Sequence, residues 1–487
     1  MTKKVIIIGA GFGGLSAAAL LANKGYDVTV LEKNSSHGGR GRVWKEKGFI
    51  FDMGPSWYLM NDVFEKFFEE LGEKPENYYK LKRLDPAYRI FFGNNKQLDI
   101  RADINKNRET FEKLEKGGAK KFDEYLKKSE YQYNIAMKDF IYKEYNKLTD
   151  MFSLKMLVEG SKLHVFENMD RYTKRYFNNS EARKILEYTL VFLGGSPKNT
   201  PAMYNIMSHI DFNMGVWYPD GGISAVADAI YKIAKKKGVK FKFDEPVEQI
   251  ITENGKATTV KTNKALYKAD IVISNADYAH TELKLLDQKS RTYDKKYWAK
   301  RVYAPSAFII YLGIKGKIKS LTHHNLFFEN DWQKHFDEIF NNPKWPKEPS
   351  YYISCPSKTD KKVAPKGHEN IFVLVPVAPG LKDDEVTREE YYNKTMTHIE
   401  NLLGEKIRDK IVVKRIYSHR DFYNDYNAYK GTALGLSHTL MQTAVLRPRQ
   451  KSRKVKNLYY TGQYTHPGIG VPMVIISSQI LANNVFK

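Results

Sequence analysis

Two glycine-rich segments, one at each end of the chain, carry the residue types and spacings that could do chemistry. The first is Gly9-Ala-Gly11-Phe12-Gly13-Gly14, and the second is Gly462-Gln-Tyr-Thr-His466-Pro-Gly-Ile-Gly470-Val471-Pro472-Met473. Glycine loops that open a helix present backbone N–H groups and the positive end of the helix dipole to phosphate oxygens. We therefore predict one cofactor site that both ends of the chain build.

The elements around the first segment indicate the kind of cofactor. Residues 5–8 are typical of a buried parallel strand and residues 15–21 of a helix of small residues, which is the context that a dinucleotide fingerprint requires. Gly9 permits the tight turn, Gly11 lets a pyrophosphate approach the backbone, and Gly14 lets the helix lie near the strand. Phe12 and Gly13 complete the loop. A purely structural glycine loop is the alternative, which the flanking elements disfavour.

The next segment favours FAD over NAD. A second strand, residues 28–31, ends at Glu32 and Lys33, and an acid there is expected to bind the adenosine ribose and to disfavour a 2′-phosphate. Gly39 and Arg40 follow almost at once, where they can add an N–H group and a guanidinium to the same pyrophosphate.

The remaining elements of the predicted site lie in a turn and at a helix start. Gly54, Pro55 and Ser56 form a turn after a third strand. Near the C-terminus, residues 458–461 are typical of a strand, Gly462 breaks it, and residues 470–473 begin a helix. The N-terminus of that helix, aimed at a flavin, would stabilise negative charge that develops during reduction.

The Gly-Gly-Arg element at 38–40, the turn at 51–56 and the segment at 465–472 resemble the phytoene desaturase family of carotenoid desaturases, within the flavin amine-oxidase superfamily. Similar segments extend the resemblance over essentially the whole chain. Gln463 and Tyr464 depart from it, because many members carry small residues there. The resemblance implies bound FAD, with the strand that begins at Val247 beside the adenine.

The resemblance also implies an activity, namely FAD-dependent desaturation of a long acyclic isoprenoid such as phytoene in carotenoid biosynthesis. Hydride would pass from an allylic carbon to the flavin, an adjacent proton would be lost, and quinone or oxygen would accept the electrons. Alternatives on the same flavin frame are a carotenoid or retinoid isomerase or saturase, and an amine oxidase. The non-enzyme alternative is a prenyl-protein escort.

The sequence does not identify a catalytic acid or base. His466 is a tempting base, but a histidine beside Pro-Gly is more often structural. Glu159 and Asp170 are unsupported candidates for the proton acceptor. His323 and His324 are expected to point to opposite faces of a strand, so we predict no metal site.

We predict an α/β fold that consists of a Rossmann-type FAD-binding domain, a discontinuous α+β substrate domain and a helical, membrane-facing cap. The FAD-binding domain is expected to comprise residues 1–93, 216–283 and 427–487, the helical cap of the substrate domain residues 94–215, and the rest of the substrate domain residues 284–426. Aromatic residues at helical spacing between 113 and 188 are more often a packing face than a lipid anchor.

Composition limits the partners and the compartment. Cys355 is the only cysteine among 487 residues, which excludes an intramolecular disulfide and favours a reducing compartment. The formal net charge is +23, but no nucleic-acid-binding motif accompanies it. Solubility is one explanation, and attraction to anionic lipid is the other. Since no run of apolar residues is long enough to span a bilayer, we expect a cytoplasmic protein, peripheral on the inner face of the cell membrane.

Overall fold

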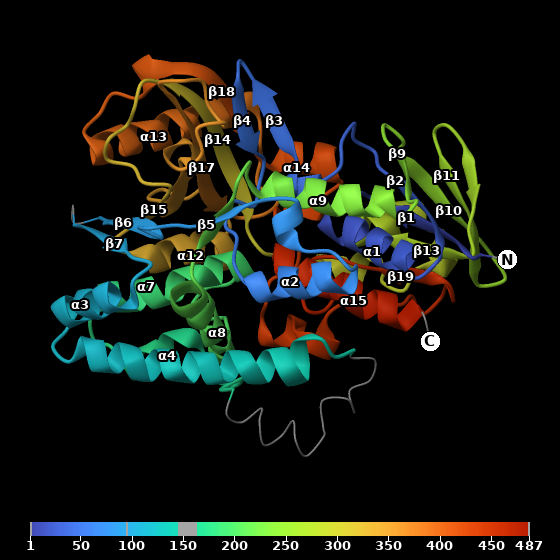
Figure 1. Cartoon of the computed structure of the whole chain (residues 1–487), viewed down its shortest axis with the longest axis horizontal. Helices are drawn as coiled ribbons and strands as arrows, with labels where there is room; N and C mark the ends of the chain where they lie inside the picture. The colour runs from blue at the N-terminus through green and yellow to red at the C-terminus, as the bar shows by residue number, and fades with distance from the viewer. Residues whose placement is uncertain (1, 94–95, 145–162, 486–487) are drawn as a thin grey trace.

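The computed structural model describes residues 2–93, 96–144 and 163–485 (Figure 1). A parallel sheet forms the centre of one half, with the strand order β19-β13-β1-β2-β9. Numbered along the chain and read from β9 to β19, this order is 3-2-1-4-5, the Rossmann arrangement. Its strands are β1 (Lys4–Ile8), β2 (Asp27–Leu31), β9 (Lys240–Lys242), β13 (Ile271–Ser274) and β19 (Leu458–Tyr460). The chain therefore returns twice to complete the sheet, as predicted for a discontinuous α/β fold.

Both faces of the parallel sheet are buried, which explains its continuous apolar strands. Val5 and Ile7 of β1 pack with one set of helices, whereas Ile6 and Ile8 pack with a small antiparallel sheet on the other face. The helices are α1 (Phe12–Asn23), α9 (Ile223–Lys236) and α15 (Val471–Val485), and the small sheet consists of β10 (Val247–Glu253), β11 (Lys256–Thr262) and β12 (Leu266–Lys268).

Close packing between α1 and its neighbours requires small residues. A Cβ on Gly14 would lie 1.9 Å from the carbonyl oxygen of Gly9, so any other residue would push the helix away from β1. Ala17, Ala18 and Ala19 are fully buried in the same helix, which packs against both α9 and α15.

A second, seven-stranded sheet lies beside the first (Figure 1), in the order β18-β14-β17-β16-β15-β6-β7. Its pairs are antiparallel except β15 with β6. Residues of β14 and β17 on one face pack with α13 (Glu385–Leu403). The strands are β6 (Tyr88–Phe92), β7 (Gln97–Ile100), β14 (Ser306–Lys315), β15 (His324–Phe328), β16 (Tyr351–Ser354), β17 (His368–Val377) and β18 (Ile411–Tyr417).

The topology differs in one respect from the predicted division of the chain. The expected boundary at residue 93 separates β6 from β7, which pair with each other in the seven-stranded sheet. The apolar run of β6 is compatible with either sheet, and its pairing with β15 places it in the second. The sheet pairing therefore favours a boundary before Tyr88.

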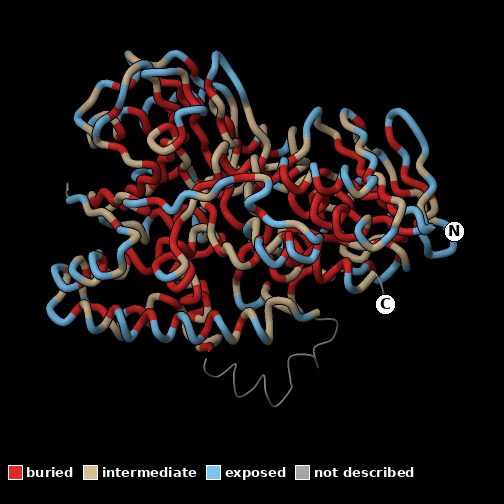
Figure 2. Tube along the Cα trace, viewed as in Figure 1, coloured by how far each residue is buried: buried red, intermediate tan, exposed pale blue. Residues whose placement is uncertain are grey.

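Helices below the seven-stranded sheet form the cap. Figure 2 shows buried positions alternating with exposed ones along α4, and Phe122, Tyr125 and Tyr133 are among the buried ones. The aromatic stripe on α4 is therefore a packing face. The cap elements are α3 (Ile104–Leu114), α4 (Gly118–Ile135), α6 (Met169–Lys174), α7 (Ser180–Glu187), η5 (Tyr188–Leu193), α8 (Ile206–Ser208) and the π-helix η7 (His209–Met214).

Shorter elements connect these layers. The hairpin β3–β4 precedes α2, and β5 pairs with β8. In the described residues no helix is both long and apolar enough to cross a bilayer. The connecting elements are α2 (Asn61–Glu70), α10 (Tyr278–His280), α11 (Lys295–Ala299), α12 (Trp332–Phe340), α14 (His419–Tyr426), β3 (Val43–Glu46), β4 (Phe49–Asp52), β5 (Leu81–Arg83) and β8 (Trp217–Pro219).

Candidate functional site

A cavity of about 1450 Å³ begins at the carboxyl ends of β1 and β2 and continues beneath the seven-stranded sheet. Open α/β sheets bind ligands at this edge, and the volume exceeds the usual range for one small ligand. Gly14 does not line the cavity, because it packs against Gly9. The other predicted cofactor residues do: Gly9, Gly11, Phe12, Gly13, Glu32, Lys33, Gly39, Arg40, Gly54, Pro55, Ser56, Val247, Gly462, Gly470, Val471, Pro472 and Met473.

Gly11 provides the clearest test of whether a dinucleotide fits. Its φ of −74° is open to any residue, so the backbone conformation does not require glycine. A Cβ would lie 3.0 Å from Nδ2 of the Asn275 side chain and 3.9 Å from the Cα of Gly39. Gly11 borders the cavity, at the place where the fingerprint predicts the close approach of a pyrophosphate.

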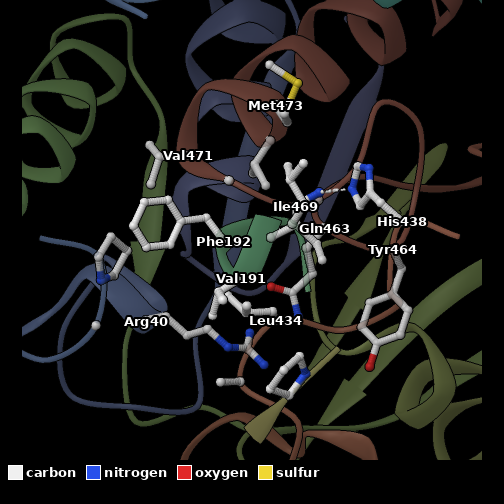
Figure 3. Close-up of a pocket in the computed structure, with 18 of the residues that line it drawn as sticks. Arg40, Val191, Phe192, Leu434, His438, Gln463, Tyr464, Ile469, Val471 and Met473 are labelled. Atoms are coloured by element: carbon white, nitrogen blue, oxygen red, sulfur yellow. Dashed lines mark hydrogen bonds between the residues drawn. The ribbon is translucent and has the colours of Figure 1, made fainter. Parts of the chain in front are cut away.

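Arg40 extends into the same part of the cavity (Figure 3). Its guanidinium lies 5.0 Å from the centre of the Tyr426 ring. In the described part of the chain its buried Nε has no hydrogen-bond partner. A buried donor without a partner is costly unless a ligand accepts from it, and a pyrophosphate oxygen would do so.

Glu32 connects the first two loops of the fingerprint. Its carboxylate accepts hydrogen bonds from the backbone N–H of Ala10 at 2.7 Å and of Asn34 at 2.8 Å. The acid is thereby fixed at the end of β2, at the position expected for ribose binding. Beside it, Lys33 donates to the carbonyl of Asn424 at 2.5 Å, and burial lowers its pKa.

The C-terminal segment is held by a histidine that the sequence did not identify. His438 Nε2 accepts a hydrogen bond from the backbone N–H of Ile469 at 3.1 Å (Figure 3). Gly468 has a φ of +133°, and a Cβ there would lie 2.2 Å from His438 Nε2. This contact fixes the turn before Gly470, so that the N-terminus of α15 borders the cavity through Val471 and Met473.

Beyond the nucleotide half, the cavity is walled mainly by apolar and aromatic side chains. One end lies under the seven-stranded sheet. Another reaches solvent, because Phe166 and Met441 line the cavity and are 91% and 69% exposed. The walls of the inner part include Trp57, Tyr188, Phe192, Ala307, Leu326, Phe328, Trp332, Phe336, Ile339, Tyr352 and Leu374.

His466 lines the cavity and is structurally engaged. Its Nε2–H donates to the carbonyl of Ile141 at 3.0 Å, so this nitrogen cannot accept a proton. Burial lowers the pKa of His466 to about 4, which keeps the ring neutral at pH 7. These contacts support the structural interpretation of His466.

The remaining candidates from the sequence do not form a catalytic cluster. His323 and His324 are not on opposite faces as expected: their rings lie 4.4 Å apart, because His323 precedes β15. Each Nδ1 is hydrogen-bonded, to Thr359 and Tyr352 respectively. Among the described residues no three potential ligands are grouped to hold a metal.

The two carboxylates named as possible proton acceptors gain no support. Asp170 accepts from Lys174 at 2.7 Å and does not line the cavity, and Glu159 lies outside the described residues. Burial raises the pKa of the Cys355 thiol to about 12, which makes it a poor nucleophile.

Asn275 is a second residue of the site that was not predicted as one, although it lies in the segment 273–277 that resembles the family. It follows β13, and a Cβ on Gly13 would lie 2.4 Å from its Oδ1 and one on Gly462 2.9 Å from the same atom. One amide therefore lies between the glycines from both ends of the chain.

Tyr464, which departs from the family pattern, donates to Asp277 Oδ2 at 2.6 Å.

Comparison with known proteins agrees with this geometry. The family model for flavin-containing amine oxidoreductases matches residues 12–486. A carotenoid 3,4-desaturase from Haloarcula japonica is 47% identical over 486 residues, which cover 100% of this chain and 98% of the relative. The chain belongs to the carotenoid desaturases of the flavin-containing amine oxidoreductase family. It is accordingly an FAD-dependent oxidoreductase.

Two further matches concern the family and the fold, respectively. A zeta-carotene-forming phytoene desaturase from Myxococcus xanthus is 32% identical over 488 residues, covering 99% of this chain and 94% of the relative. An oxidoreductase from Methanosarcina mazei has a similar structure, with a TM-score of 0.64, 17% identity and coverage of 99% and 100%. At that identity the second likeness concerns the fold alone. The family is flavin-containing, and Gly11, Arg40 and the N-terminus of α15 border the cavity in which a flavin nucleotide would fit.

Proposed function

We propose that this chain desaturates a long acyclic isoprenoid, phytoene or a close relative, in carotenoid biosynthesis. The observation that carries the proposal is the continuity of one cavity, which joins the predicted nucleotide site to a chamber walled by apolar and aromatic side chains. Its relatives are a carotenoid 3,4-desaturase and a phytoene desaturase. A hydrocarbon gains its binding energy from such burial, at about 25 cal/mol per Å² of apolar surface.

The residues of the chain have positioning roles in this proposal. Bound FAD supplies a two-electron acceptor. Gly11 and Arg40 would hold the pyrophosphate, and the first turn of α15 would present backbone N–H groups to developing negative charge. The aromatic walls exclude water and align the polyene, which is the contribution that hydrocarbon oxidation requires of the protein.

The proposed activity predicts a colour change. With FAD, liposomes and quinone or oxygen as acceptor, the protein should convert colourless phytoene into products that absorb at longer wavelength. Chromatography of the products identifies how many double bonds are introduced. Oxidation of amines, or isomerisation of a carotenoid without net redox change, would contradict the desaturase proposal and support one of the alternatives on the same flavin frame.

We further propose that the protein works as a peripheral protein on the inner face of the cell membrane, with its cavity open to the lipid. Phe166 and Met441 border the cavity and are largely exposed, and Arg171 and Arg175 also line this region. Apolar tips would enter the bilayer surface while the basic residues pair with anionic headgroups.

The membrane proposal predicts weaker lipid binding in a variant with both Phe166→Ser and Met441→Ser. Full burial of an apolar side chain contributes about 1.5–3 kcal/mol. Because these two side chains would insert only partly, we expect the double variant to lose roughly 10-fold in affinity for anionic vesicles. Co-sedimentation measures it, with added salt as a second variable. Val386→Ser is the matched control, since Val386 is 67% exposed on α13, outside the cavity lining. Equal binding by the double variant and the control would contradict this orientation.

A further inference from the structure

Asp211 is a buried carboxylate that belongs to no ion pair or helix cap described above. It lies on η7 and is 4% exposed. Its Oδ2 accepts hydrogen bonds from the hydroxyls of Tyr88 at 2.7 Å and Tyr188 at 3.1 Å. In the described part of the chain its Oδ1 accepts none. A buried carboxylate with one oxygen unsatisfied is costly, so its presence calls for an explanation.

Tyr188 connects this carboxylate to the cavity. Its ring is part of the cavity wall and lies 5.8 Å from the ring of Phe192 and 6.2 Å from that of Trp57. Phe192 borders the part of the cavity that Arg40 and Val471 also line (Figure 3). Tyr188 therefore belongs to the same cavity wall as Phe192.

Desaturation leaves a proton to be removed, and the four carboxylates that line the cavity in the described residues each have a partner. Glu32 accepts backbone N–H groups, Glu167 pairs with Arg175 at 2.7 Å, and Asp277 accepts from Tyr464. Asp425 pairs with Arg42. These contacts give each of the four a structural role, which disfavours them as the proton acceptor.

We propose that Tyr188 and Asp211 form the proton-accepting arm of the active site, an inference that rests on the proposed function. As the C–H bond beside the substrate cation breaks, its electron pair forms the new C=C bond. Tyr188 Oη takes that proton while its own proton passes to Asp211 Oδ2. A proton next to a carbocation is strongly acidic, so a hydrogen-bonded phenol is a sufficient base. Reoxidation by quinone or oxygen consumes one proton per hydride, which returns Asp211 to the carboxylate.

Tyr188 is the catalytic residue of this arm, and Asp211 is a positioning residue that acts through it. The negative charge behind Tyr188 also stabilises positive charge on the substrate. Trp57, Phe192 and Tyr188 present aromatic rings to the same space, and such rings attract cations. Electrostatic and proton-transfer roles both require Asp211 in its ionised form.

This requirement gives the arm a pH dependence. Desolvation raises the pKa of Asp211 to about 7, and the hydrogen bonds from Tyr88 on β6 and Tyr188 on η5 oppose that shift. Burial lowers the pKa of His209, two residues away. Tyr125 of α4 hydrogen-bonds Ser208, and the Tyr133 ring contacts His209. Burial raises the pKa of both tyrosines, so that they stay neutral. The rate should therefore rise with pH through about 7 as Asp211 ionises.

The test compares Asp211→Asn with a matched control, Glu187→Gln. Glu187 precedes Tyr188, is buried with a pKa raised to about 7 and does not line the cavity. We expect Asp211→Asn to keep stoichiometric flavin. Its kcat should fall about 100-fold or more, which is the usual contribution of general-base catalysis, and the rise of the rate with pH through about 7 should disappear. Glu187→Gln should keep both the wild-type rate and its rise with pH. Asp211→Glu should be faster than Asp211→Asn, because it retains a carboxylate.

Tyr188→Phe provides an independent second variant if Asp211→Asn fails to fold or to hold flavin. It removes the hydroxyl and leaves the ring, so the variant should also lose most of its turnover and the rise of the rate with pH. If Asp211→Asn or Tyr188→Phe has the wild-type rate and an unchanged pH profile, the proposed proton-accepting role of Tyr188 and Asp211 is wrong. A flavin-loaded wild type that desaturates no isoprenoid would instead refute the proposed function on which the arm rests.

Discussion

Gly11→Val is expected to give a folded protein that purifies without flavin. Gly11 has a φ that any residue adopts, and the one tight contact of a Cβ at this position is with the end of the Asn275 side chain, since the Gly39 Cα lies at an ordinary 3.9 Å. The added isopropyl group would instead occupy the space of the pyrophosphate, where the fingerprint needs close approach to the backbone. Since the obstacle lies in the ligand space and not in the protein core, binding should be lost while the fold is retained.

The measurement is the flavin absorbance of the purified variant, together with its thermal unfolding. Bound ligand raises apparent stability, so the comparison must be with wild-type apoprotein. Gly14→Val is the contrasting variant, because a Cβ there lies 1.9 Å from the carbonyl oxygen of Gly9. It should damage the fold itself. A Gly11→Val protein with stoichiometric flavin would refute the role of this loop.

The nucleotide half of the molecule was predictable because its signals are local. The turn at Gly9 and the close contact at Gly14 depend on backbone sterics within a few residues. A buried parallel strand likewise has a recognisable apolar run. The predicted discontinuous sheet followed from repeated strand patterns, and the observed pairing of β1 with β2 and β13 agrees with it.

The second half of the site was not predictable from local patterns. His438 accepts a hydrogen bond from the backbone N–H of Ile469, which lies thirty-one positions further along the chain. Nothing in the sequence around His438 reveals this contact. Tyr188 and Asp211 meet only because η5, η7 and β6 pack together. A buried aromatic residue in a cavity wall and one in a core have the same sequence signal, so the length of the chamber stays hidden until the fold is known.

The two histidines illustrate a limit of strand periodicity. Alternation of faces holds within a strand, and β15 begins at His324. His323 lies one residue before that start, so the rule does not apply to the pair, and their rings contact at 4.4 Å. A prediction of side-chain faces therefore fails when one residue of the pair lies just outside the strand, and the bounds of an element differ by one or two residues between assignments.

Leu374→Trp is expected to abolish turnover of a full-length isoprenoid while leaving FAD bound. Leu374 lies on β17, a strand of the seven-stranded sheet, and lines the inner part of the cavity. Its neighbours Val373 and Val375 point to the opposite face, into the core with α13. An indole at 374 would therefore project into the chamber from β17 and would shorten the space available to a polyene.

A substrate that cannot reach its full depth presents the wrong carbon to the flavin, and a displacement of about 1 Å is enough to cost about 100-fold in rate. Product formation from phytoene should fall at least that far, with normal flavin absorbance. A shorter acyclic isoprenoid should be affected less, since it needs less of the chamber. Leu374→Met is the matched control, because it nearly conserves volume and costs under about 1.5 kcal/mol of stability. If Leu374→Trp converts phytoene as fast as Leu374→Met, the polyene does not occupy the space beneath β17, and the other branch of the cavity, toward Phe166 and Met441, would have to hold it.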